Sequence, residues 1–98
     1  MKIDKIKKEK KLTLAVSGSV DAKTAETFDN AVKESINGVE QLTVDFKGLE
    51  YLSSAGLRVL LEAQKIMNKQ GKMKIINCND DIMEIFKITG FDEILNIL

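Results

Sequence analysis

Histidine is absent from the sequence, which removes the most common general base and the most common metal ligand together. Without it, neither a Ser-His-Asp nor a Cys-His catalytic set can be assembled. The single cysteine, Cys78, cannot form an internal disulfide and is interpreted as a small apolar side chain rather than a reactive thiol. No glycine-rich phosphate-binding signature is present. We therefore expect no enzymatic activity, no metal and no cofactor.

An excess of charge of either sign is also absent. Fifteen basic side chains balance fifteen acidic ones, so the formal net charge is zero. Such a chain is not steered towards nucleic acid, which we do not expect as a partner. No apolar run approaches the roughly 20 residues of a membrane span, and the lysine-rich N-terminus lacks the apolar core of a signal peptide. We expect a cytoplasmic protein that does not insert into membranes.

Proline and linker-like segments are missing as well, and no internal repeat is found in the 98 residues. This length is typical of one domain with one core. Residues 1–98 are therefore predicted to form a single domain.

Two hydrophobic periodicities alternate along the chain. A period of two predicts four strands, at residues 1–6, 11–17, 40–46 and 73–78. A period of 3.6 predicts three helices, at about residues 25–36, 54–69 and 81–89. Thr24 is the predicted N-cap of the first helix and Asp80 or Asp81 that of the third, with Asp81 and Glu84 spaced as a capping box.

The order β-β-α-β-α-β-α predicts an α/β fold. Strands that alternate with helices require right-handed crossovers, so we expect a mixed, mostly parallel sheet of four to five strands with helices packed on it. Sites in such folds form at the carboxyl ends of strands. The loops at residues 18–24 and 47–54 should therefore lie close together and form the functional surface.

Two adjacent serines, Ser53 and Ser54, stand where the second helix is predicted to begin. One serine suffices to cap a helix, a contribution of ~1 kcal/mol. The other would lie in the first turn, where unpaired N–H groups and the positive end of the helix dipole favour an attached phosphate. The residue types alone leave both plain capping and regulated modification open.

The segment YLSSAGLRVLL, residues 51–61, resembles the signature of STAS domains in bacterial anti-sigma-factor antagonists. In that family a D/S-S-S/T/A-G-L pattern follows a strand and opens a helix. Residues 17–21 followed by Ala25 resemble the family's turn into its first helix, and residues 82–95 resemble its closing segment. Some members carry Asp before the modified serine and Ser or Thr after it, whereas this chain has Ser53 and Ala55.

The resemblance implies a mechanism called partner switching. The serine two residues before the glycine, here Ser54, would be phosphorylated by a partner kinase, with Ser53 as the alternative. The unphosphorylated form would bind an anti-sigma factor that is itself a serine kinase of the GHKL type, and so release the sigma factor. Phosphorylation would block that binding, and a metal-dependent Ser/Thr phosphatase would restore it.

The expected partner-binding residues are Asp21, Ser53, Ser54, Gly56 and Arg58. Asp21 is either an ordinary loop acid or a group that helps a kinase hold its metal–nucleotide or orient the serine. Arg58 is a partner contact, a charge that pairs with the phosphate, or a solvated side chain. Gly56 permits close approach of a sheet or a partner.

Three further interpretations remain. Asp45 could orient the loop around Gly48 by hydrogen bonds. The whole domain could instead be a non-phosphorylated scaffold subunit of a signalling or lipid-transport complex. It could also be a small-ligand sensor.

Overall fold

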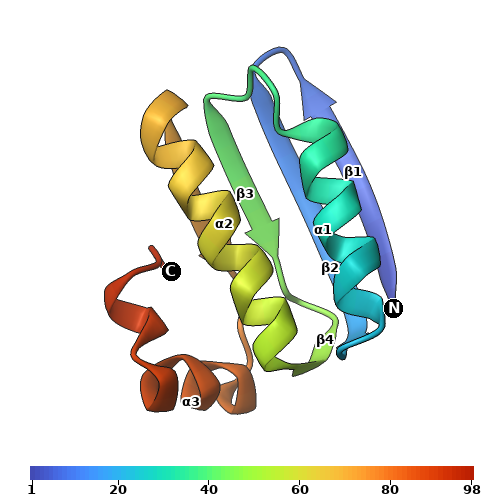
Figure 1. Ribbon diagram of the computed structural model, residues 1–98, viewed down its shortest axis with the longest axis vertical. Coiled ribbons are helices and arrows are strands. Elements are labelled where there is room, and N and C mark those ends of the chain that lie inside the picture. Colours follow the sequence, from blue (N-terminus) through green and yellow to red (C-terminus); the bar gives the residue numbers. More distant parts are fainter.

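The computed structural model describes residues 1–98 (Figure 1). Its elements, in order, are β1 (Lys2–Lys8), β2 (Lys11–Val20), α1 (Thr24–Ser35), β3 (Gln41–Asp45), β4 (Leu49–Leu52), α2 (Ser54–Gln70), β5 (Lys72–Ile76), α3 (Asp80–Thr89) and the 3₁₀ turn η1 (Phe91–Glu93). The four predicted strands and three predicted helices are confirmed. Strand β4 and turn η1 were not predicted.

The sheet is mixed and mostly parallel, as expected. Its strands follow the order β1-β2-β3-β5, and β1 is antiparallel to β2 while the other neighbours are parallel. Strand β4 pairs with the end of β2, beyond a register shift between Gly18 and Ser19. Gly18 takes a positive φ of 83°, which glycine adopts without strain.

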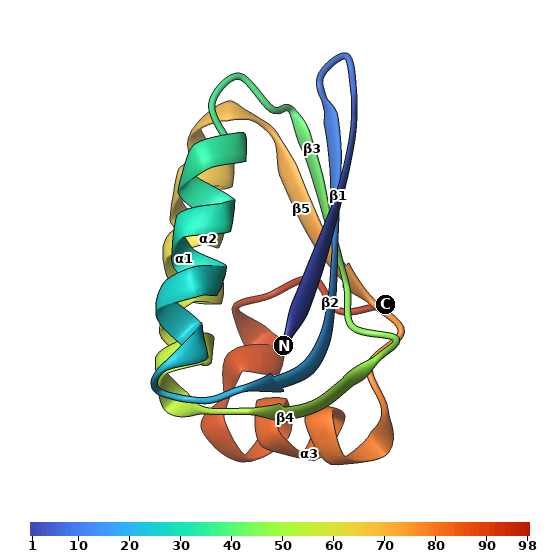
Figure 2. The ribbon, with the colours of Figure 1, turned by 90° about the vertical axis from the view of Figure 1, so that its right-hand side faces the viewer.

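Helices α1 and α2 cover one face of the sheet, and α3 lies across the end where the parallel strands finish (Figure 2). Alternate residues of β2, β3 and β5 point under the two helices and form the core together with Phe28, Leu60 and Met67. The other face of the sheet carries no helix. No buried side-chain nitrogen or oxygen lacks a hydrogen-bond partner.

Strands β2 and β4 differ from the prediction. Strand β2 continues through Gly18 to Val20, where a loop was expected, because Gly18 N–H donates to Gly48 O at 2.9 Å and β4 then continues the pairing. Strand β4 was missed because only Leu49 and Leu52 are buried in it. That spacing does not show the alternation by which strands are recognised.

The predicted caps of α1 and α3 are wrong. Thr24 is the first helical residue of α1 and Lys23, which has no capping side-chain bond, is the N-cap; Asp21 Oδ1 instead accepts from the N–H groups of Lys23 and Thr24. Asn79, one residue before the expected aspartates, caps α3 by accepting from Ile82 N–H at 2.9 Å. This leaves Asp80 and Asp81 in the first turn, where their charges favour the helix dipole, and the Asp81–Glu84 capping box does not form.

Gln70 ties the end of α2 to the connection between α1 and β3. Its amide Nε2 donates to Ile36 O at 2.8 Å and to Val39 O at 2.6 Å. We expect Gln70→Ala to lower the free energy of unfolding by about 1–2 kcal/mol, because two carbonyls lose a donor. Urea unfolding measures the change. Gln64→Ala is the control, since Gln64 donates only to exposed Asn68 and should cost less than about 0.5 kcal/mol. Equal effects would contradict the prediction.

Candidate functional site

Two loops meet at the carboxyl ends of β2 and β4, as expected from the sequence. Ser53 N–H donates to Val20 O at 2.8 Å, so the residues that open α2 are held against the residues that lead into α1. The N-termini of α1 and α2 therefore lie at the same end of the molecule (Figure 1). Each N-terminus brings unpaired N–H groups and a positive dipole end to this surface.

The two serines have different environments. Ser53 is half-buried and extended, and its Oγ accepts from Gly56 N–H at 3.2 Å, so Ser53 is the N-cap of α2. Ser54 is the first helical residue and is exposed to solvent. The structure therefore confirms that Ser53 is the cap and that Ser54 is exposed in the first turn; modification of Ser54 stays a prediction.

Asp21 lies on the neighbouring loop and is exposed. Its Oδ1 accepts from Thr24 N–H at 2.8 Å and from Lys23 N–H at 2.9 Å, and the Thr24 hydroxyl lies 3.0 Å away. These bonds, above all those from Thr24, hold the pKa of the Asp21 carboxyl below its usual value. Asp21 is thus a fixed negative charge at the site.

Gly56 is buried beneath the first turn of α2. A Cβ atom at this position would lie 2.5 Å from Leu52 Cδ1 and 2.8 Å from Val20 Cγ1. Gly56 therefore lets α2 approach β2 and β4 and sets the height of the serines above the sheet. This confirms that Gly56 permits the close approach of the sheet, and its role in the approach of a partner stays a prediction.

Arg58 is exposed one helical turn after Ser54 and borders a shallow groove between α1 and α2. The groove has a floor of small residues and charged walls, with Glu26, Asp29 and Glu62 among them. Arg58 forms none of the four ion pairs in the structure. Its guanidinium is therefore available to an anion at this end of α2.

Asp45 and Asn79 hold the loops that follow β3 and β5. Asp45 Oδ1 accepts from Lys47 N–H and from Asn77 Nδ2, both at 3.0 Å, which confirms its predicted role in orienting the loop around Gly48. Asn79 was not singled out from the sequence. Its Nδ2 donates to Leu49 O at 2.9 Å, so the residue that caps α3 also holds β4. An asparagine directly before a predicted helix was the available signal.

The profile of the STAS domain family matches residues 2–98, nearly the entire chain. The chain belongs to the STAS domain family.

Two of three similar proteins are described as anti-sigma factor antagonists. A protein of Bordetella bronchiseptica described as an anti-sigma factor antagonist is 31% identical over 93 residues, which are 93% of this chain and 80% of the relative. An anti-sigma factor antagonist from Mycobacterium paratuberculosis has the same fold, with a TM-score of 0.89 at 20% identity over 98% of this chain and 83% of that one. The phosphorylated form of the Bacillus cell fate determinant SpoIIAA superposes with a TM-score of 0.77 at 14% identity, over 99% and 91%.

This STAS domain contains no group of three or more acidic or cysteine side chains placed to hold a metal ion. None of its helices combines the length and apolar character needed to cross a bilayer. The candidate site is a surface with an exposed hydroxyl, two helix N-termini, one fixed carboxylate and one guanidinium outside any ion pair.

Cys78, the only thiol of this STAS domain, is half-buried and follows β5. Burial, with a smaller contribution from the Asp45 carboxylate, raises its pKa from 9.0 to about 11. Because the raised thiol pKa also makes stability depend on pH, the contribution of Cys78 to the free energy of unfolding is complete below pH 9.0 and declines up to about pH 11.

We expect the reaction of Cys78 with a disulfide reagent to remain slow at pH 8 and to accelerate until about pH 11. Stopped-flow absorbance against pH tests this. If the reaction rate of the folded protein had its inflection near pH 9.0, the raised thiol pKa would be contradicted. The unfolded chain is the control.

Proposed function

We propose that this STAS domain is an anti-sigma factor antagonist whose binding is controlled by phosphorylation of Ser54. The observation that carries the proposal is that only one of the two serines is used in capping α2. Ser53 satisfies the cap of α2, so the hydroxyl of Ser54 is exposed and can be modified without removing a structural hydrogen bond.

The position of Ser54 suits a phosphate. Phosphorylation adds a charge of about −1.5 to −2 at neutral pH. At the first residue of a 17-residue helix this charge meets unpaired N–H groups and the positive dipole end. Arg58, four residues later on the same helical face, is a counter-charge with the favourable order of acid before base. The fold should therefore tolerate the modification.

The phosphate would therefore change the binding of the partner and not the stability of the fold. In the unphosphorylated state the surface formed by Asp21, Ser53, Ser54 and Arg58 binds an anti-sigma factor that is also a serine kinase of the GHKL type, and the sigma factor is released. The phosphate adds bulk and negative charge to this surface beside the fixed carboxylate of Asp21 and ends the binding. A metal-dependent Ser/Thr phosphatase restores it. This protein is then substrate and ligand of its partners in the cytoplasm, not a catalyst.

The proposal is tested by incubating the protein with ATP and a GHKL kinase from its gene neighbourhood, and by measuring the intact mass. We expect a gain of one phosphate in the wild type, none in Ser54→Ala, and one in Ser53→Ala as the matched control. A gain that persists in Ser54→Ala and is lost in Ser53→Ala would reverse the roles of the serines. Binding to the kinase without any mass gain would favour a constitutive scaffold subunit instead.

A further inference from the structure

The helix-free face of the sheet carries a concentration of lysines. The strand register aligns one residue from each of four strands in a row across this face: Lys8, Lys11, Gln41 and Lys72. The next row holds one more lysine among uncharged residues: Ile6, Thr13, Thr43 and Lys74. Neither row contains a carboxylate. We call Lys8, Lys11, Lys72 and Lys74 the lysine face.

These ammonium groups have no partner within the molecule. The four ion pairs of the structure use other basic residues: Lys2, Lys5, Lys10 and Lys33. Since neighbouring strands lie about 4.8 Å apart, each row spans only about 15 Å. A positive patch therefore exists on a chain whose formal net charge is zero.

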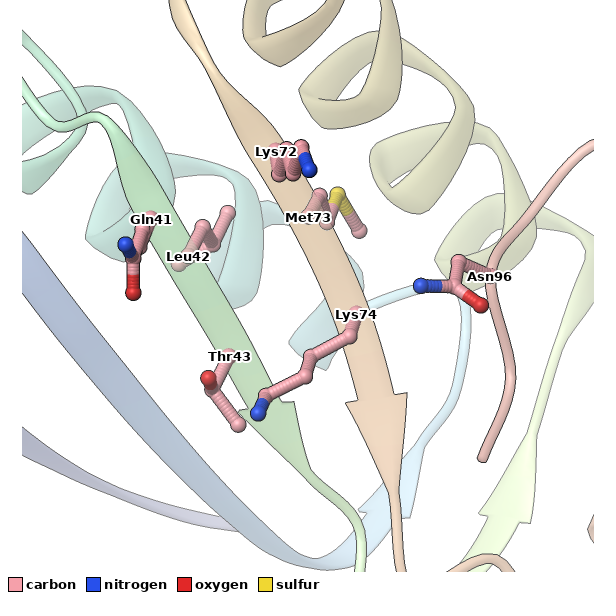
Figure 3. Close-up of a pocket in the computed structure, with 7 residues that line it drawn as sticks. All are labelled: Gln41, Leu42, Thr43, Lys72, Met73, Lys74 and Asn96. Carbon is pink, nitrogen blue, oxygen red and sulfur yellow. The ribbon is translucent and has the colours of Figure 1, made fainter.

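Part of the lysine face is hollowed. Lys72, Lys74, Gln41 and Thr43 surround a shallow depression of about 230 Å³ over β3 and β5, with Asn96 at its border (Figure 3). The Lys74 side chain extends towards Thr43, and the Asn96 amide points towards β5. All five side chains can donate hydrogen bonds. The backbone N–H groups below are used in the sheet, so the hollow suits carboxylate side chains of a protein surface better than an enclosed small anion.

The charge that balances the lysine face is concentrated in the last 20 residues of the chain. Residues 79–98 contain five carboxylates against the single lysine Lys87, a net side-chain charge of −4. All five are exposed and none forms an ion pair: Asp80, Asp81, Glu84, Asp92 and Glu93. We call these five residues the acidic end. Three of them lie on α3, across the carboxyl ends of the strands (Figure 2), and two lie on η1, before the tail that pairs with β5. The lysine rows lie near the amino ends of β2, β3 and β5.

We propose that the lysine face binds the acidic end of a second copy of this chain. The two surfaces have opposite charge, and no ion pair joins them within one molecule, so both are available to a second copy. A net charge of zero leaves no overall repulsion between copies. The contact joins different surfaces head to tail, and such contacts extend into rings or short chains. The lysine face has no arginine and no aromatic side chain on which a base could stack, which argues against single-stranded nucleic acid as its occupant.

Sedimentation velocity across protein concentration tests this proposal, which does not depend on the role of Ser54. In about 20 mM salt, where the Debye length is about 20 Å, we expect the weight-average mass to rise towards about twice the monomer at millimolar protein. In about 0.5 M salt, with a Debye length near 4 Å, the mass should stay that of the monomer. A monomer at every concentration in low salt would overturn the proposal.

Charge reversal identifies the surfaces. The double variant Lys72→Glu with Lys74→Glu, and the double variant Asp92→Lys with Glu93→Lys, should each be monomeric alone, and an equimolar mixture of the two should associate again. Lys65→Glu with Lys69→Glu, an equal change of charge on exposed positions of α2, is the matched control and should associate like the wild type.

Three results would reject the second copy as the occupant. They are failure of the mixture to associate, loss of association in the α2 control, and a wild type that stays monomeric while its lysine face binds anionic lipid vesicles or a single-stranded oligonucleotide.

Discussion

Replacement of Ser54 by aspartate is expected to weaken binding of the anti-sigma factor by at least about 100-fold, because a like charge placed in an interface costs several kcal/mol. The thermal midpoint should stay near that of the wild type. Ser54 makes no hydrogen bond through its hydroxyl in the structure, and a negative charge at the first turn of α2 favours the helix dipole by about 0.3–1 kcal/mol. Isothermal titration calorimetry and a thermal melt measure the two effects separately.

Ser54→Asn is the matched control for this experiment. Asparagine has the shape of aspartate without its charge, so it should retain most of the affinity if repulsion is the main effect. Equal losses in Ser54→Asp and Ser54→Asn would assign the effect to bulk. Unfolding of Ser54→Asp would make Ser54 structural and end the proposal. In contrast, Ser53→Ala adds no charge to the surface, so it should weaken binding far less than Ser54→Asp and lower stability by ~1 kcal/mol, the usual contribution of a cap.

Replacement of Gly71 by alanine is expected to lower the free energy of unfolding by about 3 kcal/mol, a large part of the roughly 5–15 kcal/mol that stabilises a domain. An added Cβ would lie 1.9 Å from Glu40 O. That oxygen accepts from Lys72 N–H at 2.9 Å, and Gly71 N–H donates to Met67 O at 2.7 Å, so neither side can retreat without losing a hydrogen bond. The φ of Gly71, 173°, is open to any residue, and the cost is therefore steric.

Gly38→Ala separates this steric cost from backbone strain. Gly38 has a positive φ of 78° and open space around its missing Cβ, so alanine there should cost only about 1–2 kcal/mol. Chemical denaturation of both variants gives the comparison. A loss below about 1 kcal/mol for Gly71→Ala would mean that the connection between α1 and β3 moves freely, which the paired amide bonds of Gln70 argue against.

Most of the fold and part of the site could be predicted from the sequence because they depend on local signals. Alternation and helical periodicity located the predicted strands and helices, and the adjacent serines before an apolar helix predicted one cap and one exposed hydroxyl. The caps of α1 and α3 could not be chosen this way. Each helix is preceded by several capping candidates, and the backbone turn decides which oxygen meets the free N–H groups.

The sequence by itself determined a single α/β domain without histidine chemistry, and a serine pair at the start of its central helix. These follow from residue types and from spacing along the chain, which no later packing can change. The tertiary structure alone decided that β4 joins the end of β2, that Gly56 is buried while Ser54 is exposed, and that a chain of zero net charge separates its charges onto two surfaces. Each of these depends on which distant residues the sheet register brings together, and the register is fixed only when the core is formed.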